Sequence, residues 1–235
     1  MNSRERVVTV LHKGMPDRVP VDYDANPGID RRLKAHFGLK VDDNDGLRRA
    51  LGVDIHGIGP RFVGPSRHDD IPARGINVDE WGIHRRWVEH ASGGYWDFCD
   101  FPLTEATEEQ VAAWPLPSPD DYDYNGVAEQ CRRLRCFALH VGGAGTLQPE
   151  ATNMSPEYLK RTFGGRLAFH GCISTAGPLA SGTVKETVAC CRRTLEIMMP
   201  GGGYCFAPTH QIQDNTPTAN VVAMYELVKT HGVYR

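Results

Sequence analysis

The residues best suited to chemistry follow a short apolar run near the end of the sequence. Tyr204 to Ala207 is apolar and lies between three glycines and a proline, a pattern typical of a buried strand. Thr209, His210, Gln211 and Gln213 come directly after it. Ligands of α/β folds bind at the carboxyl ends of parallel strands, so this spacing predicts His210 as a catalytic residue. The alternative is that His210 only caps a loop.

Polar residues also follow two earlier predicted strands. Val19 to Tyr23 is followed by Asp24, and the strand that begins at Val53 contains His56 and is followed by Arg61. Parallel strands open on one face, so their end loops converge. We therefore expect a substrate-binding cleft around His210, and its predicted members are Asp24, His56, Arg61 and Gln211.

A third set of residues is relevant to metal binding. His170 and Cys172 are one residue apart on a predicted strand, Leu167 to Cys172, so they would share a face. Together with Cys205 and His210 they are the nearby candidates for zinc. The simpler interpretation is a strand thiol and a rim histidine, and we predict no stably bound metal because no closed set of three ligands is visible.

Strands and helices alternate along most of the chain. Five strands of this type are expected, and they are Val19 to Tyr23, Val53 to Ile58, Phe137 to Val141, Leu167 to Cys172 and Tyr204 to Ala207. Thr183 and Glu186 form a capping box before a helix whose inward residues are predicted as Val184, Val188, Cys191 and Leu195. Thr216 is predicted to cap the last helix, with Pro217 in its first position. The alternation predicts βα units around a parallel sheet.

One segment departs from this alternation. Trp81 to Val88 and Tyr95 to Phe98, separated by Ala91 to Gly94, have the pattern of a β-hairpin. We expect this hairpin to be an antiparallel addition to the main sheet.

Composition excludes several partners and compartments. A net charge of -3 and a pI near 6.4 predict binding neither to nucleic acid nor to an anionic membrane surface. The first residues are charged and lack the apolar core of a signal peptide, and no apolar run approaches the ~18 residues of a membrane span, so we expect neither feature. Seven cysteines without a CxxC pair do not suggest a disulfide framework. We expect a cytoplasmic protein that acts on a small-molecule substrate.

Several motifs together resemble a known family. They are Ser3 to Val7 with Pro16 to Val21, Pro156 to Gly164, Gly182 to Glu186, and Gly201 to Asn220. Their order is similar to that of the uroporphyrinogen decarboxylase family, and more closely to its bacterial branch related to cobalamin-dependent methyltransferases. The resemblance implies a (β/α)8 TIM-type barrel with the active site at the carboxyl ends of the strands.

The middle of the family domain is shortened in this sequence. In the family, about three further strands separate the segment that ends at Leu147 from the segment Pro149 to Asn153, whereas here the two are fused. The resemblance therefore implies an incomplete barrel with about five of the eight strands of a full one. We predict a single domain, 1–235, with 1–147 and 148–235 as the N-terminal and C-terminal parts of the barrel.

The resemblance implies a carboxy-lyase that decarboxylates a tetrapyrrole-type or related carboxylated substrate, as in porphyrin biosynthesis, without a cofactor. His210 then matches the histidine of the porphyrinogen cleft. The sequence departs from the family because Asp22 to Gly28 holds no arginine, and Arg61 stands near the place of an expected acid.

Two alternatives stay open. One is a zinc- and corrinoid-dependent methyltransferase, in which a zinc-binding cysteine takes the place of His210. The other is a truncated, non-catalytic relic of the family. A homodimer in which two incomplete barrels cover each other would protect the unpaired sheet edges.

Overall fold

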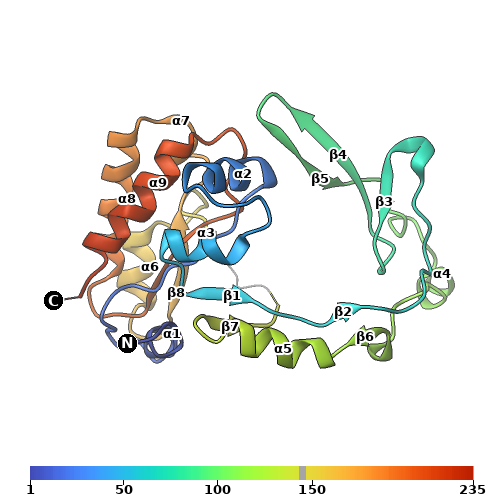
Figure 1. The fold of residues 1–235 in the computed structure, drawn as a ribbon, viewed down its shortest axis with the longest axis horizontal. Helices are drawn as coiled ribbons and strands as arrows, with labels where there is room; N and C mark the ends of the chain where they lie inside the picture. Colours follow the sequence, from blue (N-terminus) through green and yellow to red (C-terminus); the bar gives the residue numbers. More distant parts are fainter. Residues whose placement is uncertain (143–146, 235) are drawn as a thin grey trace. The chain divides into compact units, whose positions relative to one another are not determined.

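The computed structural model describes residues 1–142 and 147–234, which divide into two units. The first unit contains Met1–Ile58 and Leu134–Arg235, and the second contains Gly59–Arg133. Figure 1 shows the ribbon and labels many of the elements named below. The sequence analysis divides the predicted single domain into 1–147 and 148–235. The two units of the structure have their boundaries after residues 58 and 133 instead.

Short parallel strands form the centre of the first unit. Strand β8 (Phe169–Ile173) pairs in parallel with β9 (Tyr204–Pro208), and β1 (Ile55–Gly57) pairs in parallel with β7 (Ala138–His140). Isolated parallel bridges join Val21 to Phe206 of β9 and Leu147 to Gly171 of β8. The N–H of Asp54 donates to the carbonyl of Val21 over 2.8 Å, which connects residues 19–23 to the β1 side.

These contacts place the segments in the order β7, β1, residues 19–23, β9, β8 and Leu147. The fold is therefore mixed α/β with small parallel pairings, and the described residues form no closed barrel.

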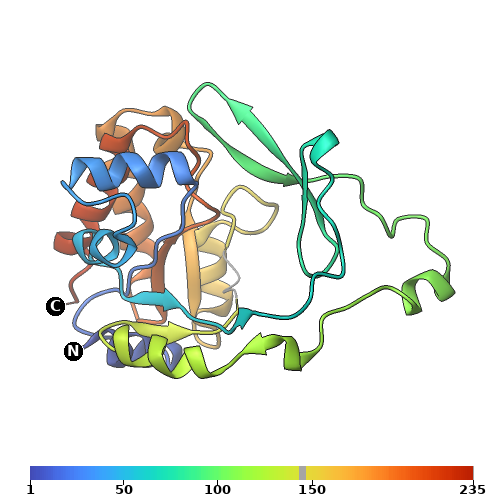
Figure 2. The ribbon, with the colours of Figure 1, turned by 45° about the vertical axis from the view of Figure 1, so that its right-hand side comes forward.

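Helices of the first unit flank these strands. They are α1 (Ser3–Leu11), α2 (Pro27–His36), α3 (Asn44–Leu51), α6 (Pro156–Phe163), α7 (Pro178–Ser181), α8 (Val184–Met198) and α9 (Thr218–His231). Figure 2 shows α8 and α9 beside β8 and β9. Within the described part of the chain, none of the helices has the length and apolar character needed to cross a bilayer.

The predicted helix ends are partly correct. Thr183 caps α8, and its hydroxyl and the Glu186 carboxylate form the predicted capping box. Cys191 and Leu195 are buried in α8, but Val184 is 42% exposed because it lies in the first turn, away from the core. The predicted cap of α9 is wrong: Pro217 takes the N-cap position, without a side-chain hydrogen bond, and the helix starts at Thr218.

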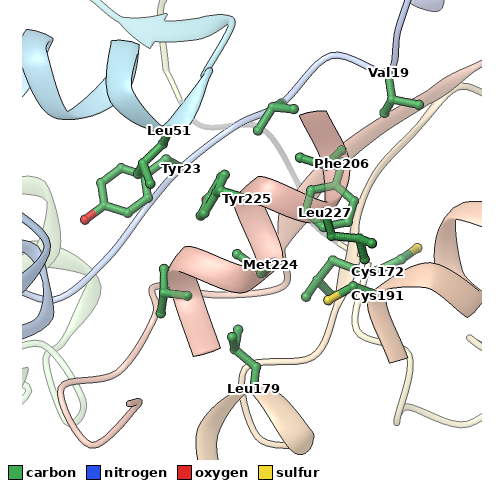
Figure 3. Close-up of a cluster of buried hydrophobic side chains, with 14 of the residues drawn as sticks. Val19, Tyr23, Leu51, Cys172, Leu179, Cys191, Phe206, Met224, Tyr225 and Leu227 are labelled. Atoms are coloured by element: carbon green, nitrogen blue, oxygen red, sulfur yellow. The ribbon is translucent and has the colours of Figure 1, made fainter. Parts of the chain in front are cut away.

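The core lies between the strands and the helices. Tyr204 and Phe206 of β9 pack with Leu195 of α8 and Tyr225 of α9, and all four are buried. Figure 3 shows part of this cluster, including Cys172 beside Cys191. Side chains alternate along β9, so Cys205 points away from this cluster and lies on the other face of the strand.

The predicted shared face of His170 and Cys172 is wrong. Gly171 and Cys172 have φ values of 111° and 68°, which break the alternation of the strand. Cys172 consequently packs into the core cluster with Phe169 and Ile173, whereas His170 contacts Asp22.

The second unit contains short strands and helices of its own. Strands β3 (Ile76–Val78), β4 (His84–His90) and β5 (Gly93–Phe98) form an antiparallel sheet, and β2 (Arg61–Phe62) pairs with β6 (Tyr122–Asp123). The helices are α4 (Glu108–Ala112) and α5 (Asn125–Arg133), with single 3-10 turns at Pro72–Arg74 and Pro119–Asp121. The predicted hairpin is confirmed as β4 and β5. It pairs with β3 and not with the parallel strands, which corrects its predicted place.

Candidate functional site

Two loops run side by side beyond the carboxyl ends of neighbouring strands. One follows residues 19–23, and the other follows β9. The N–H of Ile212 donates to the carbonyl of Asp24 over 3.0 Å, and the N–H of Asn26 donates to the carbonyl of Ile212 over 2.9 Å. This parallel pairing carries Asp24 and Gln211 to the same place, where the Gln211 amide lies 3.4 Å from Oδ1 of Asp24.

His210 lies at the exposed rim of these loops. Its Nδ1 is 3.5 Å from the side-chain amide of Gln213, which donates to the carbonyl of Gln211 over 2.8 Å. The ring is therefore open to solvent and to a ligand. His210, Gln211 and Asp24 are the predicted site residues that the structure brings into one cluster.

The carboxyl of Asp24 holds its proton more strongly than an ordinary aspartate. Partial burial is the largest cause of its raised pKa, although the residue keeps an exposed surface, and the negative charge of Asp22 raises the pKa further. Hydrogen bonds from the Ala25 N–H and from Gln211, and the charge of Arg48, oppose this rise. A perturbed pKa at a strand end is typical of functional sites.

Asp22 and His170 form a pair that the sequence analysis does not predict. Nε2 of His170 lies 3.0 Å from Oδ2 of Asp22, and both side chains are largely buried. Nδ1 of His170 is buried and finds no partner among the described residues, which favours the tautomer that donates from Nε2 to the carboxylate. The only sequence signal concerns Asp22 and not the pair: Asp22 is two residues before Asp24, a spacing that puts both side chains on the same side of an extended segment.

Two other predicted site residues do not join this cluster. His56 turns toward α3, where its Nε2 is 3.3 Å from Oδ1 of Asp45 and its ring packs against Phe137. Within the first unit, the structure therefore places His56 apart from Asp24. Arg61 is an exposed residue of β2, opposite Asp123, and belongs to the second unit.

The residues do not fit a zinc site. Burial raises the pKa of the Cys172 thiol to about 12, and it raises the pKa of Cys205 well above its usual range, so both thiols stay protonated at neutral pH. Cys172 is also in the core, away from His170. No group of three or more His, Cys, Asp or Glu residues that could hold a metal ion occurs among the described residues.

Comparisons with known proteins give little guidance. No protein family model and no curated protein matches the sequence. Among solved structures, a methyltransferase from Methanosarcina mazei is similar with a TM-score of 0.49 and 14% sequence identity, over 97% of this chain and 98% of that chain. A likeness of this degree establishes neither a shared fold nor a shared activity.

Proposed function

We propose that the chain is an enzyme of the uroporphyrinogen decarboxylase type, which removes carbon dioxide from a tetrapyrrole-type or related carboxylated substrate. The observation that carries the proposal is the carboxylate pair Asp22 and Asp24. His170 holds Asp22, and the pKa of Asp24 is raised. Carboxyl groups in two different environments can divide the roles of acid and charge stabiliser. The order of the parallel pairings supports the further proposal that the first unit is part of a (β/α)8 barrel.

Decarboxylation defines what these residues would have to do. The bond between the carboxylate and its carbon breaks, carbon dioxide leaves, and the electron pair stays on the carbon, which then takes a proton. We assign Asp24 as the proton donor because its raised pKa keeps it protonated at higher pH than an ordinary aspartate. His210 and Gln211 would hydrogen-bond to the remaining carboxylates of the substrate.

This assignment exchanges two predicted roles, because the sequence predicts His210 as catalytic and Asp24 as substrate-binding. Both residues stay in the site. The charge of Asp22 adds to the rise in the pKa of Asp24 that burial causes, and His170 positions Asp22.

The test uses the full chain with uroporphyrinogen III kept reduced under nitrogen. Mass spectrometry counts the carboxyl groups lost. We expect carboxyl loss by the wild-type protein and a rate about 10²-fold lower for His210→Ala and Asp24→Asn. His12→Ala and His231→Ala, which change histidines at helix ends, are the controls and should keep the wild-type rate. No carboxyl loss by the wild type, or equal losses in all four variants, would reject the proposal.

A non-catalytic relic is the second candidate, because the described strands do not close a barrel. Open sheet edges favour association, so a homodimer is the partner that we propose for the active protein. Sedimentation tests this: a stable dimer supports the enzyme, and an aggregating monomer without turnover supports the relic. We further propose a cytoplasmic location, which the absence of paired cysteine motifs supports.

A further inference from the structure

The second unit contains an aromatic pocket of about 300 Å³. Its lining is mainly apolar and includes four aromatic rings, those of Trp81, Phe98, Phe101 and Trp114. His84 and Cys99 are also among the lining residues. All these residues lie between positions 81 and 114, so the pocket belongs to this unit alone.

Specific contacts hold the walls of the pocket in place. The indole N–H of Trp114 donates to the main-chain carbonyl of Trp81 over 2.9 Å. The ring of His68 stacks on Trp114 with 5.0 Å between centroids, and its Nε2 lies 2.8 Å from the carbonyl of Pro115. A Cβ at Gly82 would approach the Trp114 ring to 2.4 Å, so glycine is required for this close packing. The pocket is therefore a preformed feature.

The pocket leaves much aromatic surface in water. Trp81, Phe98 and Phe101 are 47%, 56% and 64% exposed. Asp100 and Phe101 also have positive φ values of 62° and 41°, a backbone conformation that L side chains rarely adopt. Strained backbone and clustered exposed apolar surface are both typical of binding sites.

We propose that this pocket binds a flat, apolar molecule of one or two fused rings with one hydrogen-bonding group directed at His84. The volume is at the lower end of the range for small-molecule pockets, and a helix about 10 Å wide would not fit. Aromatic walls favour stacking with a planar ring. Nδ1 of His84 lies 3.5 Å from Oδ2 of Asp100, and we assign Nε2, the other ring nitrogen, to the polar substituent of the ligand. The pocket is independent of the proposed decarboxylation.

The probe is 2-naphthol, titrated into the full chain by isothermal calorimetry. We expect saturable binding, and Trp81→Ala should weaken it about tenfold by removing one stacking ring. Trp96→Ala is the matched control, because Trp96 is also 47% exposed but does not line the pocket. Trp81→Ala keeps the carbonyl that binds Trp114. The rings of Trp87 and Trp96 on the hairpin lie 5.7 Å apart between centroids. Their near-ultraviolet circular dichroism signal should be the same in Trp81→Ala and the wild type if the hairpin of the variant is folded.

Alkylation of Cys99 gives a second readout. Saturating 2-naphthol should slow the reaction of Cys99 with iodoacetamide and leave the exposed Cys131 and Cys136 unchanged, as measured on peptides by mass spectrometry. Equal weakening in Trp81→Ala and Trp96→Ala, or no protection of Cys99, overturns the proposal. If the wild-type protein self-associates and Trp81→Ala does not, the proposal is also overturned, because a second copy of the chain would then occupy the pocket.

Discussion

The hydroxyl of Tyr225 donates a hydrogen bond to the main-chain carbonyl of Asp22 over 2.9 Å. The ring of Tyr225 is fully buried and packs edge-on against Tyr23, with 6.0 Å between centroids. Burial raises the pKa of Tyr225 well above its usual range, so the hydroxyl remains a donor. Helix α9 thus holds the strand that carries both site carboxylates.

We expect Tyr225→Phe to lower the free energy of unfolding by about 1 kcal/mol, because it removes one hydrogen bond and leaves the Asp22 carbonyl without this donor. Urea titration measures the change. Tyr124→Phe, at an exposed position of the second unit, is the control and should be neutral. Equal stability of Tyr225→Phe and the wild type would mean that solvent or another donor replaces the hydroxyl.

A buried carboxylate at the amino ends of the strands predicts a larger effect. Asp54 is fully buried and accepts hydrogen bonds from Arg6 at 2.5 Å, Arg18 at 2.6 Å and the N–H of Val21 at 3.0 Å. We expect Asp54→Ala to lower the free energy of unfolding by about 3–5 kcal/mol, because Arg18 loses its counter-charge and Arg6 keeps only Asp17. Asp42→Ala, at an exposed position, is the control. A loss below about 1 kcal/mol would show that Asp17 or water compensates for the carboxylate.

The parts of the fold that depend on local sequence are predictable. Thr183 and Glu186 lie three residues apart and cap α8 as expected, and the glycines at 93 and 94 mark the hairpin. The cluster of Asp24 with Gln211 also follows from the rule that parallel strand ends open on one face.

The parts that depend on distant register are not predictable. Asp22 meets His170 across 148 positions of sequence, and only the alignment of three strands decides that contact. Cys172 leaves the expected face because its backbone has a φ of 68°. This conformation is unusual for a residue with a side chain, and nothing in the local sequence indicates it. His56 contacts Asp45 of α3, and this contact depends on how α3 packs against β1, which the local sequence does not indicate.

The glycine run before β9 contains a position that only glycine can occupy. Gly202 has a φ of 70°, and a Cβ there would lie 2.3 Å from the carbonyl oxygen of Gly14. Gly38 has a similar φ of 66° with nothing within 4 Å of its Cβ position. Both alanine variants should lose about 1–2 kcal/mol for the left-handed backbone.

Gly202→Ala should lose at least about 1 kcal/mol more than Gly38→Ala, because its methyl group clashes with main chain. Thermal or urea unfolding of the two variants gives the difference. Equal losses would mean that the loop at Gly14 moves aside at little cost.

Asp17 predicts a loss of stability in acid. The hydrogen bond from Arg6 is the largest cause that holds the pKa of Asp17 well below the ordinary value of 3.8. A lowered folded-state pKa stabilises the protein above pH 3.8, and this contribution is lost as the pH falls from there through the folded-state value. Urea midpoints measured from about pH 6 to pH 3 should therefore fall more steeply for the wild type than for Asp17→Asn. Parallel curves would contradict the role of this carboxylate.

Asp24 predicts the opposite dependence. Its folded-state pKa is raised above 3.8, so its contribution to stability is present below that pH and is lost as the pH rises through the raised value. At a pH above the raised pKa the charged Asp24 is a cost, and there Asp24→Asn should be more stable than the wild type by less than about 1 kcal/mol, because solvent screens this partly exposed group. The difference should vanish below pH 3.8.

Asp30→Asn is the contrasting variant of a nearby carboxylate, because Asp30 accepts a hydrogen bond from Tyr23 at 3.0 Å and pairs with Lys34 at 2.6 Å. It should be less stable than the wild type at neutral pH. A residue that lowers stability and whose replacement slows decarboxylation is retained for its role in the reaction. If Asp24→Asn is instead less stable at neutral pH, or if its effect does not change with pH, the carboxyl does not carry a raised pKa and the assignment of Asp24 as proton donor fails.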